Sequence, residues 1–307
     1  MKRLFGSLAL GSGFVLVSAI SGCTPDNTVK PGPPELLAFS VRGPDGNPVA
    51  ITTADDGGAS DPIAPLSAFV AVFDRLLDPT TLETIDPDGG AISEKDGIGV
   101  VESGDTPVPS TTLYVPNGDA FFTLIYPKGP SVIITPTRGL PSSSPVTVTL
   151  ETGKLRSHDQ KSSVVLGDGG MSTLTFETQP LSVTVSVPAP VPPDGGADAD
   201  DGGAGDGGGM SNWVTPPVAP DFDVSISFNN FTDKDATEAA IKVTVNTVPV
   251  AATVEPDPST PGAWTVKHPD GGWLAGAVVT VTVGADAADQ FHKTLGTATS
   301  ATFTVKP

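Results

Sequence analysis

This 307-residue sequence has many carboxylates but few histidines and cysteines, and the spacing of these side chains matches no catalytic set. The three histidines, His158, His268 and His292, lie in predicted loops, and none stands at a metal-ligand spacing such as His-Glu-x-x-His. There is no Gly-x-Ser-x-Gly elbow and no phosphate-binding glycine loop. We therefore expect no catalytic residues and no enzyme. A hydrolase using two of the many carboxylates is the enzymatic alternative.

Recurring Asp-Gly-Gly triplets are the pattern closest to a metal site, because calcium loops combine carboxylates with turn-forming glycines. The acidic run at 194–208 departs from the EF-hand pattern, since Gly202 stands where a third Asp ligand belongs and no Glu closes the loop. It is also one residue short of the calcium-binding nonapeptide. Turn formation is the simpler interpretation, so no metal or cofactor is expected, with weak calcium binding as the alternative. The triplets are 56–58, 88–90, 168–170, 194–196, 201–203, 206–208 and 270–272.

Three tryptophans could serve a binding function. Trp213, Trp264 and Trp273 could stack on sugar rings, as aromatic side chains do in carbohydrate-binding sandwiches. A tryptophan beside a strand is more often part of the core, and this is the interpretation that we favour.

The N-terminus has the layout of a signal peptide. Lys2 and Arg3 precede an apolar stretch over residues 4–20, which is shorter than the roughly 20 residues that a spanning helix needs. This stretch therefore predicts a cleaved signal peptide over 1–22.

The end of this segment contains the only cysteine of the chain. Ile20, Ser21, Gly22 and Cys23 resemble the lipobox of bacterial lipoproteins, in which an aliphatic and two small residues precede a cysteine that becomes acylated. The resemblance implies a membrane anchor at Cys23, and Thr24 in the following position points to the outer membrane. The protein is therefore expected in the cell envelope, facing the periplasm or the outside, with an envelope protein or a glycan as an unidentified partner.

Composition limits the other partners and the means of stabilisation. Removal of 1–22 leaves 14 Lys+Arg against 35 Asp+Glu, a net charge of 14 − 35 = −21. Such a surface repels nucleic acid, which is excluded as a ligand. Because the only thiol is the anchor, the mature chain forms no internal disulfide and depends on packed cores.

The remaining sequence predicts an all-β protein. Gly and Pro together number 35 + 32 = 67, and short runs of Val, Thr, Ser and Phe alternate with period two, as in strands with one buried and one wet face. Short helical turns are expected at 78–83 and 233–240. The alternating runs are 69–73, 146–150, 173–176, 181–187, 224–228, 241–245, 279–283 and 303–305.

One layout of strands and loops occurs twice. After a proline-rich, flexible tether over 23–35, the first copy spans 36–180 and the second spans 181–307. An acidic Gly/Asp loop of the second copy covers 190–220 and is too poor in apolar residues to fold by itself. Residues 188–221 are interpreted as a loop inside the second copy, or alternatively as a linker between the two.

The first copy carries a family motif. Phe73-Asp-Arg-Leu-Leu-Asp-Pro-Thr-Thr-Leu82 resembles the Phe-Ser-x-Pro-Met-Asp-x-x-Thr-Leu signature of the bacterial Ig-like domains found in surface-layer proteins, and the segment 146–180 is similar to their last hairpin. The second copy keeps Phe228 and Asp233, but it has Lys234 and Ala236 where the motif has a proline-like or small residue and a threonine. The motif positions, taken as structural, are Phe73, Asp78, Pro79, Thr81, Phe228 and Asp233.

This resemblance implies two tandem immunoglobulin-like Greek-key β-sandwiches. It also implies a non-catalytic role in spacing, display or adhesion. The leading hypothesis is thus an anchored envelope lipoprotein of that kind, and the alternative is a carbohydrate- or protein-binding surface module.

Overall fold

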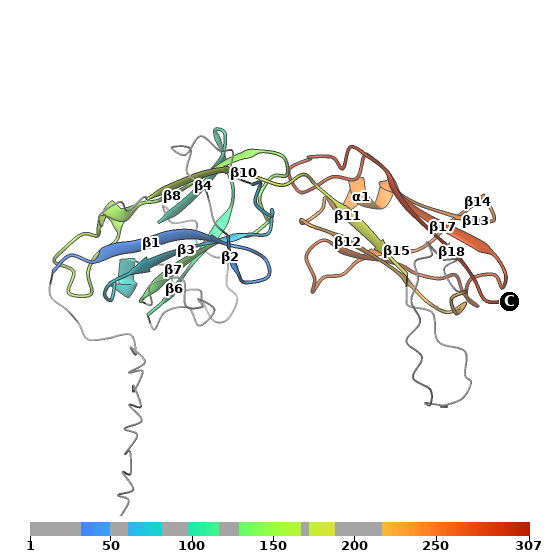
Figure 1. Ribbon diagram of the computed structural model, residues 1–307, viewed down its shortest axis with the longest axis horizontal. Helices are drawn as coiled ribbons and strands as arrows, with labels where there is room; N and C mark the ends of the chain where they lie inside the picture. The colour runs from blue at the N-terminus through green and yellow to red at the C-terminus, as the bar shows by residue number, and fades with distance from the viewer. Residues whose placement is uncertain (1–31, 50–60, 82–97, 117–128, 167–171, 188–216) are drawn as a thin grey trace, which may run out of the picture.

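The structure of the protein is a computed structural model that describes residues 32–49, 61–81, 98–116, 129–166, 172–187 and 217–307. In this part of the chain the strands form four sheets, accompanied by one short α-helix. The prediction of an all-β protein is confirmed. Figure 1 shows the sheets gathered into two halves, strands β1 to β10 in one and β11 to β18 in the other.

The N-terminal half consists of two sheets. One has the order β2-β1-β3-β7-β6, with the short β9 beside β1, and the other has the order β10-β8-β4-β5. Neighbouring strands are antiparallel except β1 and β9. The strands are β1 (Glu35–Arg42), β2 (Pro48–Val49), β3 (Ala68–Phe73), β4 (Gly99–Ser103), β5 (Thr106–Pro107), β6 (Ser110–Val115), β7 (Ser131–Pro136), β8 (Pro145–Leu150), β9 (Val165–Leu166) and β10 (Thr173–Glu177), with single 3₁₀ turns at Pro79–Thr81 and Thr152–Lys154.

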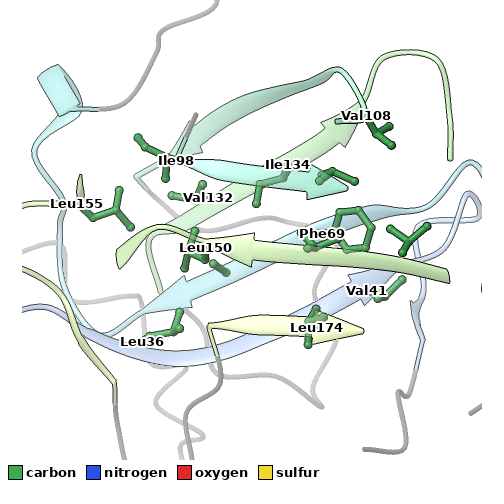
Figure 2. Packing of buried hydrophobic residues seen from close by; sticks show 14 of the residues in the cluster. Leu36, Val41, Phe69, Ile98, Val108, Val132, Ile134, Leu150, Leu155 and Leu174 are labelled. Atoms are coloured by element: carbon green, nitrogen blue, oxygen red, sulfur yellow. The ribbon is translucent and has the colours of Figure 1, made fainter. Parts of the chain in front are cut away.

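These two sheets enclose one hydrophobic core. Phe69 and Ile134 of the first sheet and Leu150 and Leu174 of the second all point into it (Figure 2). The ring of Phe69 stacks on that of Phe176 at a centroid distance of 5.6 Å. Alternate residues of β8 and β10 are buried, as the period-two pattern predicts.

Strands β3 and β7 depart from that pattern because both of their faces are buried. Val70, Val72 and Ile133 form a second, smaller apolar cluster on the face turned away from the core. The expectation of one wet face is wrong here. The physical reason is visible in the sequence, since Phe69–Phe73 is an unbroken apolar run, which is typical of a strand covered on both sides.

The C-terminal half has the same plan. Its sheets have the orders β11-β12-β16-β15 and β14-β13-β17-β18. The elements are β11 (Val183–Ser186), β12 (Val224–Phe228), α1 (Lys234–Ala240), β13 (Ile241–Val245), β14 (Val248–Val250), β15 (Val254–Pro256), β16 (Ala263–Val266), β17 (Val278–Val283) and β18 (Thr299–Thr304). Here the alternation holds, because Val279, Val281 and Val283 of β17 are buried. The outward hydroxyls of Thr280 and Thr302 lie 2.9 Å apart.

Apart from the short β2 and β9, the strands of the two halves correspond. The sheet orders β1-β3-β7-β6 and β10-β8-β4-β5 match β11-β12-β16-β15 and β18-β17-β13-β14, and matching strands follow one another in the same order along the chain. Each half has its own core cluster. Because β11 pairs with β12, the segment 188–216 joins two neighbouring strands of one sheet.

We predict that Phe69→Ala destabilises the N-terminal half by roughly 3–5 kcal/mol, since it removes a fully buried ring from the core together with its stacking contact on Phe176. Urea unfolding followed by circular dichroism measures the change. Leu113→Ala on β6, at a side chain that is 41% exposed, is the control and should cost less than about 1 kcal/mol. Equal losses for the two variants would contradict the core described above.

Candidate functional site

The motif residues of the first copy build a turn at the end of β3. Phe73 is buried in the core, and Asp78, five residues later, is buried with its Oδ1 atom accepting from the backbone N–H (3.0 Å) and the hydroxyl (2.8 Å) of Thr80. Pro79 and Thr81 begin and end the 3₁₀ turn. Burial raises the pKa of the Asp78 carboxyl. The hydrogen bonds from Thr80 and Gln160, together with the charge of His158, outweigh burial and hold the pKa below its ordinary value. These residues shape the backbone.

The second copy repeats this arrangement with an α-helix in place of the 3₁₀ turn. Phe228 ends β12 in the core, and the Oδ1 atom of Asp233 accepts from the backbone N–H of Ala236 at 2.8 Å. Asp233 is thus the N-cap of α1, so the helical turn expected at 233–240 is confirmed. The aspartate five residues after the phenylalanine has the same capping role in both halves.

A buried carboxylate connects the halves. Asp289 is fully buried, and its Oδ2 atom accepts from the backbone N–H of Ser142 in the N-terminal half at 2.8 Å. Its Oδ1 atom accepts from the backbone N–H groups of Phe291 and Lys293, both at 2.9 Å. Asn230 donates to Oδ2 through Nδ2 at 3.3 Å. Four donors therefore compensate the buried charge.

Asn230 makes the second polar connection. Its Nδ2 atom donates to the backbone oxygen of Leu140 at 2.8 Å and lies 3.2 Å from the hydroxyl of Ser142. The Oδ1 atom of Asn230 accepts from the backbone N–H of the next residue, Phe231. Gly139 leaves room for this contact, because a Cβ atom there would lie 2.2 Å from Oδ1 of Asn230. Phe291 packs against the N-terminal core. We call Leu140, Ser142, Asn230, Asp289 and Phe291 the joint.

The connecting chain is fixed beside the joint. Asn229 accepts from the backbone N–H of Ser182 at 2.9 Å through Oδ1 and donates to the backbone oxygen of Pro180 at 3.0 Å through Nδ2. The side chain of Asn229, which follows β12, thus holds the crossover between the halves. These contacts hold the two halves in one relative position. The carboxylate of the joint, that of Asp289, is buried and so is not accessible for acid–base chemistry.

The end of the C-terminal half that is away from the joint has an apolar hollow, and we call this end the tip. The hollow has a volume of about 490 Å³. Exposed apolar side chains occur at this end, with Leu274 65% exposed and Val248 61% exposed. No sequence pattern singled out this surface, since Leu274 follows a tryptophan in a loop. The residues that line the hollow include Pro220, Val250, Trp273, Leu274 and Ala275.

Tryptophan burial removes one predicted binding mode. Trp264 and Trp273 are buried, and their Nε1 atoms donate to the hydroxyl of Thr232 and the backbone oxygen of Phe222, both at 2.8 Å. The interpretation that these two rings stack on sugars is therefore wrong, because their faces are packed in the core. Trp213 lies outside the described residues.

The structure brings none of the three histidines into a cluster. His158 and His292 are exposed and His268 is half-buried, and the described part of the chain contains no group of three or more metal-ligating side chains. In the Asp270–Gly272 triplet, Gly271 and Gly272 have φ of +89° and +86°, as turn formation requires. The other six triplets lie outside the described residues.

The predicted anchor also lies outside the described residues, as do Ile20, Ser21, Gly22 and Cys23. The described chain begins at Gly32 and enters β1 at Glu35, at the end of the N-terminal half away from the joint. None of the helices in the described ranges has the length and apolar character to cross a membrane. The described chain thus begins at the opposite end of the two halves from the tip (Figure 1).

Comparison with known proteins gives no family for this chain: neither protein-family models nor curated proteins match it.

We predict that Asp289→Ala lowers the free energy of unfolding by about 2–4 kcal/mol, since it leaves buried N–H groups of the joint without an acceptor. It should also broaden the distribution of distances between the halves in solution X-ray scattering. Asp286→Ala, at an exposed position of the same loop, is the matched control. Identical scattering and stability for the two variants would contradict a holding role for Asp289.

Proposed function

We propose that this chain is an envelope lipoprotein, anchored in the outer membrane through acylated Cys23, whose two halves act as non-catalytic modules that space and display a surface. The joint is the observation that carries this proposal. A pair of modules held by buried hydrogen bonds keeps a fixed direction, as a spacer must, whereas a flexible linker would let the second module fold back.

The finer fold assignment is part of the proposal. Each half is proposed to be an immunoglobulin-like Greek-key sandwich, of the surface-layer type in the first copy. Strand order supports this, because β11-β12-β16-β15 and β18-β17-β13-β14 correspond to the A-B-E-D and G-F-C-C′ sheets of such domains. The matching caps at Asp78 and Asp233 support a common origin of the two halves.

A second candidate function is protein binding at the tip. The observation in its favour is the exposed Leu274 beside an apolar hollow, a combination that suits a protein surface better than a sugar. Anchoring at one end and an apolar surface at the other fit a single role, in which the modules carry the tip away from the membrane.

Acylation is tested with Cys23→Ser in the full chain expressed in a bacterial host. The wild-type protein should incorporate an alkyne-labelled palmitate and enter the detergent phase of Triton X-114, whereas Cys23→Ser should lose both properties because no other cysteine exists. Thr24→Ala should stay acylated and serves as the control. Fatty-acid label that persists in Cys23→Ser would rule out the anchor.

A further inference from the structure

The tip has a counterpart in the N-terminal half, and the two are built alike. The backbone N–H of Trp273 donates to the oxygen of Pro220 at 2.7 Å, and the N–H of Leu140 donates to the oxygen of Pro65 at 2.8 Å. Gly272 and Gly139, which precede these residues, both have positive φ. Pro220, Trp273, Leu274 and Ala275 thus occupy the positions of Pro65, Leu140, Pro141 and Ser142.

Two further pairs of hydrogen bonds fix this correspondence. The backbone oxygen of Val218 accepts from the N–H of Lys306, and the N–H of Val218 donates to the oxygen of Thr304. In the same way, the backbone oxygen of Ile63 accepts from the N–H of Gln179, and its N–H donates to the oxygen of Glu177. Isolated parallel bridges join Val218 to Val305 and Ile63 to Thr178. The match therefore rests on the backbone around the surface, not on the similarity of single side chains.

The two equivalent surfaces differ in what covers them. In the N-terminal half, Pro141 and Ser142 are buried under the joint, whereas at the tip Leu274 and Ala275 are exposed. The N-terminal surface receives the second half through two backbone groups, the N–H of Ser142 and the oxygen of Leu140.

The same two backbone groups are present at the tip. They are the N–H of Ala275 and the oxygen of Trp273, and within the described ranges neither has a hydrogen-bond partner. Beside them the hollow offers apolar contact through Leu274 and Val250. The tip therefore presents a donor, an acceptor and an apolar wall in the arrangement that already binds one module end.

We propose that the tip is a docking surface for the end of a further β-sandwich module, one that presents a carboxylate, a primary amide and an aromatic ring as Asp289, Asn230 and Phe291 do. The carboxylate accepts from Ala275 N–H, the amide donates to Trp273 oxygen, and the ring covers the hollow. This names the kind of partner for the display role proposed above and rests on that role.

A second copy of this chain does not provide such an end. The position of Asn230, two residues after Phe228, is occupied in the N-terminal half by Arg75, two residues after Phe73. Ser157, bridged to Leu77, occupies the position of Asp289, which is bridged to Thr232. Among the residues that the structure describes, the one matching end is already buried in the joint.

The test uses the full chain extended after Pro307 by a second copy of residues 181–307, which has a complete core of its own. Amide hydrogen exchange is measured at Ala275. In the unextended chain this N–H should exchange fast while that of Ser142 is protected; in the extended chain it should slow at least about tenfold. Replacing the appended counterpart of Asp289 by alanine should restore fast exchange.

A second measurement does not depend on that substitution. Leu274→Glu changes an exposed side chain and so leaves both native cores intact, but it places a charge against the incoming ring. In the extended chain it should restore fast exchange at Ala275 and broaden the scattering distance distribution, whereas Asp286→Ala should do neither. Fast exchange in the extended chain overturns the proposal, and so does slow exchange in the unextended chain, which would mean that the tip is already covered. Both readouts are taken without membranes, so a failure of anchoring at Cys23 is recognised separately.

Discussion

The carboxylate of Asp289 is the charge on which the arrangement of the two halves depends. It is removed from water, which is unfavourable for an ion unless several donors replace the lost hydration. Three backbone N–H groups and one side-chain amide do this, and one of the backbone groups belongs to the other half. Separating the halves would take a donor away from a buried charge. The position of one half is thus fixed by the electrostatic needs of the other.

The same site shows how two halves with one strand plan differ in their contacts. Asp289 in the second half corresponds to Ser157 in the first: Asp289 follows β17, and Ser157 follows β8, the strand equivalent to β17. Ser157 bonds within its own loop through Asp159, whereas Asp289 reaches the neighbouring half. A change of side chain at one loop position therefore turns a local turn into an intermodule contact, with no change in strand order.

Local features were predictable from the sequence, and long-range ones were not. Strands such as β17 and β18 follow from alternation, and the helical turn of α1 was expected over 233–240. The joint has no such signal, because Asp289 and Ser142 are 147 positions apart and serine, asparagine and aspartate are ordinary loop residues. The buried outer face of β3 was visible as an unbroken apolar run but needed a covering layer that sequence spacing does not specify.

The polar character of the joint matters for its precision. Apolar contact alone would tolerate sliding, since hydrophobic association has no direction. Bonds of 2.8 Å to the N–H of Ser142 and to the oxygen of Leu140 fix one register between the modules. At the tip, alanine replaces that serine, so the hydroxyl near Asn230 has no equivalent while both backbone groups remain. Register at the tip would then come from the backbone alone, and more of the affinity would come from Leu274 and the apolar hollow.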